Sequence, residues 1–302
     1  MSDWWRIPVA VFIWPGLLGG ALSGWLLLWI NRKLMARLQG RKGPPFYQPF
    51  FDFVKLMDKE TIVPRGTNRI IFYALPLVAL VSVTLALALI PIPGNPLHSF
   101  NGDLILLIYL LEMPVLCEIL AGFVTRSLYA QVGATREAIL SLGYNLPFLT
   151  ALIALAVHAK SSALHEIVTA APGHALVFVG LAFLLSVPAR LKSNPFSIAN
   201  AESELVAGIL TEYNSKPLAV FELVHGLELT ALAGLSGVIF LPFAHSFMAG
   251  LGIYILCALM LIFLTTVLAA ATARLKVQHA LSFFWSWGAA AAGLAVAVAV
   301  IW

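Results

Sequence analysis

Charged residues are scarce in this sequence of 302 residues. Only 11% of the residues are Asp, Glu, Lys or Arg, and 61% are hydrophobic, whereas an ordinary soluble domain carries roughly 25% charged residues. So few charges cannot cover a surface that faces water, which argues against a soluble globular protein. The composition therefore predicts a chain that lies mostly within a lipid bilayer.

Cysteine is nearly absent as well. The two cysteines, Cys117 and Cys257, stand alone in apolar runs. They form no CxxC pair and no cluster with histidines of the kind that holds zinc or an iron–sulfur group. We therefore predict neither a disulfide framework nor a metal centre.

Long apolar runs are abundant. A helix needs about 20 apolar residues to cross the hydrocarbon core of a bilayer, and charges, prolines and turn residues divide the chain into about eight such runs. The predicted spans are Pro8–Ile30, Ile70–Ile90, Leu104–Val124, Ile139–His158, His174–Pro188, Leu218–Leu241, Phe247–Ala271 and Leu281–Trp302. The fifth run is short for a bilayer. We predict an all-α, polytopic integral membrane protein with a single membrane domain over residues 1–302.

The basic residues support this division of the chain. Of the 18 Lys and Arg residues, 16 fall in the segments 31–69, 126–137, 190–216 and 272–279, which are alternate connections. Because basic residues collect in cytoplasmic loops, these segments are predicted to face the cytoplasm, and both termini the opposite side of a cell inner membrane. The net charge of +4 follows from the same bias, so no nucleic-acid partner is needed to explain it.

The first cytoplasmic segment holds a basic turn and an amphipathic stretch. The turn at residues 41–45 reads RKGPP, in which glycine permits unusual dihedral angles and the prolines fix the chain. From Tyr47 to Lys59, aromatic and aliphatic residues alternate with charges at helical spacing. Such a helix suits the plane of the lipid interface, and we predict that it lies there.

Ionisable residues within the predicted spans are the main functional candidates, because an ionised side chain there costs about 2.5 kcal/mol or more. Glu112 and Glu118 lie in the third span, and Glu222, His225 and Glu228 follow at intervals of three along the sixth. Carboxylates and imidazoles suit proton relays, and Glu222 and His225 are close enough on a helix for a hydrogen bond. Any single one is equally well explained as a neutral group bonded to a neighbouring helix. The set indicates a hydrophilic path.

Three more acids gather in the cytoplasmic segment 190–216. Glu202, Glu204 and Glu212 lie close together where basic residues are expected. If this stretch is helical, Glu204 and Glu212 share one face and Glu212 can pair with Lys216. The group indicates the mouth of a cavity or a partner surface, with a solvated helix rim as the alternative.

Several motifs, in consistent order from about residue 30 to the C-terminus, resemble one known family. Residues 41–44 (RKGP), 48–49 (QP) and 52–56 (DFVKL) are similar to a pattern in the membrane heel subunit of respiratory complex I. Residues 195–205 and 211–213 resemble a further segment of that subunit. Residues 133–138 (GATREA) and 273–276 (ARLK) are similar to motifs of the homologous subunit in group 4 nickel–iron hydrogenases, including formate hydrogenlyase.

The resemblance implies an eight-helix subunit that joins a cytoplasmic redox arm to ion-translocating membrane subunits and holds no cofactor itself. The implied partners are hydrogenase-like large and small subunits, a ferredoxin-like iron–sulfur subunit, antiporter-like membrane subunits and lipid. The motif residues implied to face the redox arm are Arg41, Gly43, Pro44, Asp52, Lys55, Arg136 and Glu137. The length and the hydrogenase-type motifs favour the formate hydrogenlyase branch.

The chain departs from the complex I pattern at four positions. Asn145 and Arg190 stand where that pattern has acids, Ser197 replaces an aspartate, and His225 aligns with a glutamate. Several acids of the family's proton path are therefore absent. Glu112, Glu118 and Glu222 are the candidates for a replacement path.

Other functions stay open at this point. The chain also fits the quinone-chamber subunit of a complex-I-type oxidoreductase that oxidises NADH or ferredoxin. A stand-alone secondary transporter would carry acids within its spans too, although the two halves of this chain show no convincing internal repeat. An intramembrane enzyme is disfavoured, because the sequence lacks HExxH and GxSxG motifs.

Overall fold

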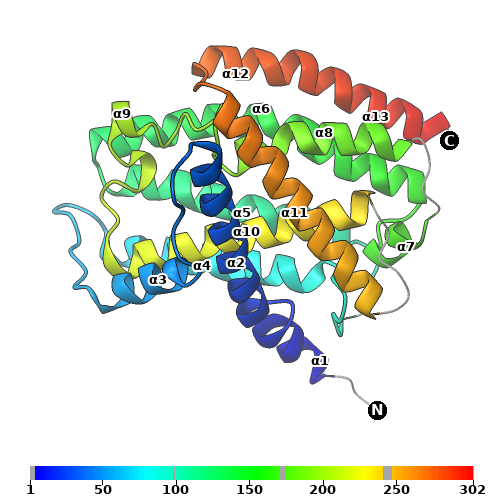
Figure 1. The fold of residues 1–302 in the computed structure, drawn as a ribbon, viewed down its shortest axis with the longest axis horizontal. Coiled ribbons are helices and arrows are strands. Elements are labelled where there is room, and N and C mark those ends of the chain that lie inside the picture. The colour runs from blue at the N-terminus through cyan, green and yellow to red at the C-terminus, as the bar shows by residue number, and fades with distance from the viewer. Residues whose placement is uncertain (1–3, 98, 171–174, 241–246, 302) are drawn as a thin grey trace.

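The computed structural model describes residues 4–97, 99–170, 175–240 and 247–301. This part of the chain is built from helices joined by turns and irregular connections (Figure 1). The elements in chain order are α1 (Arg6–Pro8), the π-helical turn η1 (Val9–Ile13), α2 (Leu17–Leu38), α3 (Gln48–Asp58), α4 (Arg69–Leu89), α5 (Asp103–Val124), α6 (Leu128–Ala159), α7 (Leu164–Thr169), α8 (Ala175–Arg190), α9 (Glu202–Leu205), the 3-10 turn η2 (Gly208–Leu210), α10 (Ser215–Phe240), α11 (Phe247–Ala271), α12 (Val277–Phe283), the π-helical turn η3 (Phe284–Gly288) and α13 (Ala289–Ile301).

Seven helical segments in the described ranges are long and apolar enough to cross a membrane. They are α1 to α2, α4, α5, α6, α10, α11 and α12 to α13. The eighth apolar helix, α8, has 16 residues and is short for a full crossing. The prediction of an all-α polytopic membrane protein is confirmed, and the fifth span is the short one, as expected. Its predicted start at His174, together with Leu241 and Trp302, lies outside the described residues.

Helix α10 is the central element of the bundle. In its most apolar stretch 83% of the residues are buried, against 33–56% in the other long spans, and it packs on α2, α3, α4, α8 and α11. The crossing with α2 is close, because a Cβ atom on Gly24 would lie 2.6 Å from the carbonyl oxygen of Gly226. Small residues at such crossings allow helix backbones to approach in a membrane. The candidate acids of α10 therefore lie in the middle of the protein.

The connections gather at two ends of the bundle. In Figure 1 the α3–α4 connection, α9 and the start of α12 lie towards the left, whereas α1, α7 and the end of α13 lie towards the right. The predicted cytoplasmic segments 31–69, 190–216 and 272–279 thus share one end, and the two ends of the described chain lie towards the other. This arrangement agrees with the alternation that the basic residues predicted.

Two of the segments predicted to face the cytoplasm differ from expectation in their structure, while α3 matches the predicted amphipathic helix. Segment 126–137 is largely helical rather than a loop, because α6 already begins at Leu128. The stretch 202–213 is not one helix: α9 ends at Leu205, Val206 has φ +61°, and η2 follows. A positive φ at a β-branched residue interrupts a right-handed helix, so Glu204 and Glu212 do not share a helix face.

Candidate functional site

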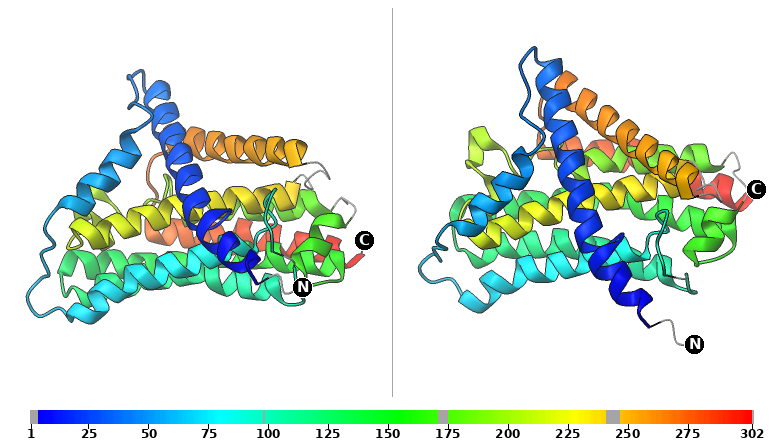
Figure 2. Two further views of the ribbon diagram at one scale, coloured as in Figure 1. Left: turned by 90° about the horizontal axis from the view of Figure 1, so that it is seen from below. Right: turned by 60° about the horizontal axis from the view of Figure 1, so that its bottom comes forward.

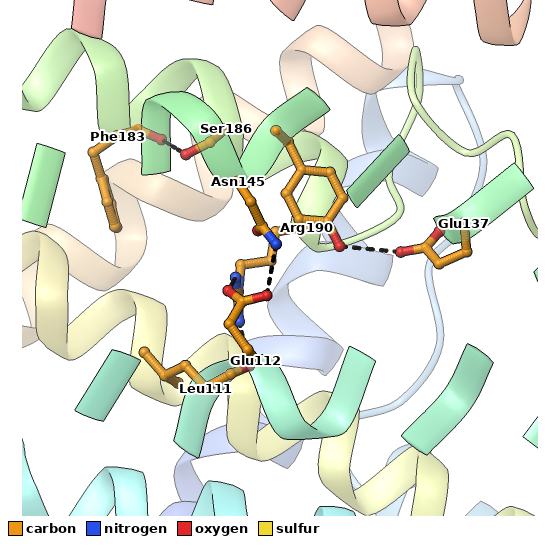
Figure 3. A network of polar contacts seen from close by, with 8 residues as sticks. Leu111, Glu112, Glu137, Asn145, Phe183, Ser186 and Arg190 are labelled. Carbon is orange, nitrogen blue, oxygen red and sulfur yellow. Dashed lines mark hydrogen bonds and ion pairs between the residues drawn. The ribbon is translucent and has the colours of Figure 1, made fainter. Parts of the chain in front are cut away.

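A buried ion pair lies in the interior of the bundle. Arg190, at the end of α8, donates from Nη1 to Oε1 of Glu112 on α5 at 2.6 Å. Asn145 on α6 donates to the other oxygen of Glu112 at 2.7 Å, and the second guanidinium nitrogen donates to the carbonyl of Leu111. Figure 3 shows Arg190 and Asn145 converging on Glu112. Three helices therefore hold one charge pair in place.

The surroundings of Arg190 exclude water. Its side chain is 1% exposed, while that of Glu112 keeps 26%. The guanidinium carbon lies 4.4 Å from the ring centroid of Phe148, which is within cation–π range. Because arginine does not lose its proton in proteins, a buried arginine needs an ionised partner, and Glu112 supplies it.

A second polar pair belongs to α6 alone. The Tyr144 hydroxyl donates to Oε1 of Glu137 at 3.2 Å, and both side chains are fully buried. The other oxygen of Glu137 and Oε1 of Glu228 on α10 are buried and have no hydrogen-bond partner in the part of the chain that the structure describes. Glu137, Glu228 and Arg190 also interact electrostatically. These residues form one buried cluster with the Glu112 pair.

A third charge contact lies just beyond α8. Lys192 forms an ion pair with Glu118 on α5, and the two side chains are 11% and 6% exposed. Burial lowers the pKa of the Lys192 ammonium, while the carboxylates of Glu228 and Glu222 act in the opposite direction. Lys192 thus lies within electrostatic range of acids on both α5 and α10.

The acids of α10 begin at a surface pocket of about 310 Å³ between α2, α3 and α10, which we call the Glu222 pocket. Its charged lining residues are Arg32, Asp52, Lys55, Lys59 and Glu222. Arg32 pairs with Asp52 at 3.0 Å. From the exposed Glu222, the polar positions on α10 continue to the half-buried His225 and then to Glu228, which is 4% exposed. Polar groups therefore extend from the surface into the interior.

The structure brings four predicted acids, Glu112, Glu118, Glu228 and Glu137, into one interior region. Glu222 and His225 form no hydrogen bond with each other among the described contacts, so the predicted pair is not made. Helix α10 instead places Glu222 at the surface pocket and His225 deeper.

The acids of segment 190–216 lie apart from that region. Glu204 accepts a hydrogen bond from Arg136 at 2.6 Å, which lowers the pKa of Glu204. Glu212 lies in the turn before α10 and forms no ion pair with Lys216 in the described structure. The side chain of Glu202 lies outside the described part.

The predicted redox-arm residues are divided between surface and interior. Arg41, Gly43 and Pro44 lie in the turn after α2, and Asp52 and Lys55 line the Glu222 pocket. Arg136 is partly exposed, but its neighbour in the motif is 0% exposed. That neighbour, the glutamate at position 137, cannot touch a soluble partner in this conformation and belongs to the interior cluster instead.

Sequence reasoning did not select Arg190, Asn145, Tyr144 or Lys192 as site residues. Asn145 lies within an apolar run and Arg190 at the end of one, so polarity in an apolar context was the available signal. It could not show which helix supplies the partner. Within the described residues, no group of three or more His, Cys, Asp and Glu residues is placed to hold a metal ion.

Comparisons with known proteins agree on one family. The family model for NADH dehydrogenase matches residues 12–300. The H-type subunit of NADH-quinone oxidoreductase from Dehalococcoides mccartyi is 29% identical over 94% of this chain and 84% of its own length. The corresponding subunit from Rhodospirillum rubrum is 31% identical over 80% of this chain and 77% of its own length. An H-type subunit from Geobacter metallireducens is 34% identical over 72% of this chain and 73% of its own length.

A solved structure extends this similarity to the fold. It is a chain of the membrane-bound sulfane sulfur reductase, an archaeal respiratory membrane complex, and superposes with a TM-score of 0.88 at 27% identity. The match covers 97% of this chain and 99% of that chain. The buried charges described above thus lie in a membrane subunit of a known type. The chain belongs to the NADH dehydrogenase family, as a membrane subunit of the H type found in complex-I-like respiratory complexes.

Proposed function

We propose that this chain is the heel subunit of an ion-translocating complex of the hydrogenase type, in a cell inner membrane with both termini on the non-cytoplasmic side. In that role it anchors a soluble arm of hydrogenase-like large and small subunits and a ferredoxin-like subunit. It links electron transfer in this arm to antiporter-like membrane subunits.

The observation that carries the proposal is the run of charged side chains from the Glu222 pocket to the interior cluster. Ionisable groups inside a membrane are costly and mark ion pathways in many membrane proteins. Buried carboxyl oxygens of Glu137 and Glu228 lack partners among the described residues, and stability alone does not favour such groups. Their presence supports a role in moving protons.

The geometry divides the work among these groups. Arg190 stays charged and is paired with Glu112, so these two groups form a fixed ion pair. Glu137 and Glu228 have no ion-pair partner of their own within the described structure, and a carboxyl group in that position is able to take up and release a proton. A change of charge in the soluble arm near the Glu222 pocket would act on Glu228 through the electrostatic contacts of Lys192.

The hydrogenase-type arm is favoured by motifs and length. Residues 133–138 and 273–276 resemble the hydrogenase branch. The quinone oxidoreductase subunits from D. mccartyi, R. rubrum and G. metallireducens are matched over 73–84% of their length, while the sulfane sulfur reductase chain is matched over 99%. The shared architecture therefore also occurs in a complex named for a different reaction.

A quinone-reducing complex is the second candidate. The Glu222 pocket places Trp25, Phe53 and Leu56 beside Arg32 and Asp52, and apolar walls with a few polar groups suit a quinone ring. In that case the pocket would bind substrate rather than only transmit charge.

Purification of the complex through a tag on this chain decides between the two. We expect hydrogenase-like subunits, bound nickel and iron, and hydrogen evolution from a reduced dye. A complex that lacks nickel and reduces a soluble quinone would replace our proposal with the second candidate. A chain that purifies without soluble subunits would contradict both and favour a transporter.

Coupling is tested by Glu222→Gln, which keeps the size of the side chain but cannot exchange a proton. We expect normal assembly and redox-driven ion uptake into vesicles reduced by about tenfold or more, as for loss of a proton-transfer group. Glu166→Gln at the opposite end of the bundle is the matched control and should behave as wild type. If Glu222→Gln also behaves as wild type while Glu222→Ala lowers the yield, Glu222 is a structural acid.

A further inference from the structure

The end of α2 carries a high concentration of positive charge. Residues 31–42 contain five basic residues and no acid: Arg32, Lys33, Arg37, Arg41 and Lys42. Asp52 of α3 pairs with Arg32 at 3.0 Å. Arg41 donates a hydrogen bond to Gln39, which leaves its charge in place. An excess of positive charge therefore remains at the turn that follows α2.

Part of this charge surrounds a second surface pocket of about 400 Å³, which we call the basic pocket. It is lined by Arg41, Lys42, Asn31 and Pro44 among others, and shares only Arg32 with the Glu222 pocket. This pocket lies outside the acidic path and is not explained by it.

The turn that forms the basic pocket is held against α2. The indole nitrogen of Trp29 donates to the carbonyl of Pro44 at 3.0 Å. A Cβ atom on Gly43 would lie 2.9 Å from the Cα of Lys33, so the backbone of the turn packs directly on the helix. These contacts preform the pocket before any ligand binds.

The apolar residues beside the pocket indicate its depth in the membrane. Trp29 adjoins it, and tryptophan is enriched at the level of the lipid headgroups. Immediately after the turn, the rings of Phe46, Tyr47 and Phe51 form a row with centroid distances of 5.5 and 5.3 Å. Phe46 is 71% exposed and Phe51 55%. Figure 2 shows α2 and α3 diverging from the connection that joins them.

We propose that the basic pocket binds the phosphate headgroup of an anionic phospholipid whose acyl chains lie along the aromatic row. Arg41 and Lys42 would donate to the phosphate oxygens, because guanidinium and ammonium groups recognise phosphate in this way. An acidic surface of a soluble protein would satisfy the charge, but acidic side chains would not cover the exposed rings of Phe46 and Phe51. A phospholipid satisfies both the positive charge and the exposed aromatic rings. Arg41 and Pro44, which were predicted to face the redox arm, would then belong to a lipid-binding site.

The test is native mass spectrometry of the purified complex in mixed micelles that contain equal amounts of phosphatidylglycerol and phosphatidylcholine. Wild type should retain phosphatidylglycerol selectively. The double variant Arg41→Gln/Lys42→Gln should bind it about 30-fold more weakly, as expected for the loss of two charges next to a lipid surface. The control Arg65→Gln/Lys276→Gln removes the same charge from exposed positions outside the pocket and should bind within about threefold of wild type.

Two further measurements separate lipid from its competitors. Inorganic phosphate alone should not displace the bound phosphatidylglycerol, since it lacks acyl chains to cover the aromatic row. A photocrosslinker at position 42 should capture lipid in the intact complex. The proposal would be overturned if both double variants lost binding equally or if wild type showed no preference for phosphatidylglycerol. It would also be overturned if phosphate displaced the lipid or if the crosslinker captured a soluble subunit.

Discussion

Replacing Glu112 and replacing Arg190, the two partners of the interior ion pair, should lower stability by unequal amounts. Glu112→Met leaves Arg190 with its charge, 1% exposed and without its partner. Arg190→Met leaves Glu112, which is 26% exposed and still bonded to Asn145. Glu112 would thus keep a hydrogen bond and contact with water, whereas the arginine, which cannot release its proton, would stay charged and buried. The loss of Glu112 should therefore be the more damaging change.

The magnitudes follow from burial. Removing one partner of a buried ion pair costs about 3–5 kcal/mol when the remaining charge stays buried and unpaired. We expect Glu112→Met to lower the free energy of unfolding by an amount in that range. A group that keeps a hydrogen bond and partial hydration costs less, about 1–3 kcal/mol, which applies to Arg190→Met. The double variant replaces both charges with apolar groups and should be more stable than Glu112→Met. The coupling energy between the two positions should be about 2 kcal/mol.

The assay is unfolding of the purified chain in mixed micelles by a denaturing detergent, followed by the fluorescence of the 8 tryptophans. The matched control is the pair of Arg136 and Glu204, which has the same 2.6 Å separation but side chains 27% and 54% exposed. Methionine at either control position should change stability little, because exposed ion pairs contribute little. Additive effects of the two interior variants, or a larger effect of Arg190→Met, would refute the reasoning.

Two other substitutions test the close crossing and the second polar pair. Gly24→Ala would bring a methyl group to 2.6 Å from the Gly226 carbonyl oxygen and should lower the free energy of unfolding by about 1–3 kcal/mol. The control Gly252→Ala, at a position with open space around it, should leave the free energy of unfolding unchanged. Equal effects of the two variants in the same assay would contradict the close approach of α2 and α10. Tyr144→Phe removes the hydroxyl bonded to Glu137 and should slow ion uptake into vesicles at unchanged complex yield. Unchanged uptake would exclude this pair from the path.

The spans and the amphipathic helix α3 were predictable because they depend on local properties. A run of apolar residues crosses a bilayer whatever its neighbours are, since lipid is the solvent and the backbone bonds are made within the helix. The observed α4 (Arg69–Leu89) and α5 (Asp103–Val124) agree with the predicted runs to within a residue or two. Helix α3 likewise follows from the alternation of charges and aromatic rings in its own sequence.

Local signals did not decide how far a helix continues past the membrane. Helix α6 extends to Leu128 with polar residues in its first turns, and it packs on η2 and α9. The acidic stretch after Ala201 breaks at Val206, where φ is +61°, and Gly208 follows with φ +62°. Glycine is a poor helix former, so Gly208 was a local signal for this break, whereas the start of α6 depends on how the segment packs.

The sequence by itself determined that acids lie inside the membrane, and the tertiary structure decided what each one contacts. Glu112 meets Arg190, 78 residues away, only because α5 and α8 bring these positions together in the interior. Glu204, which was predicted to lie in an acidic group, pairs with Arg136 at the surface. Glu137, which was predicted to face the redox arm, is buried. The reason is physical: hydropathy depends on one segment alone, whereas the partner of a buried charge depends on which faces of different helices meet.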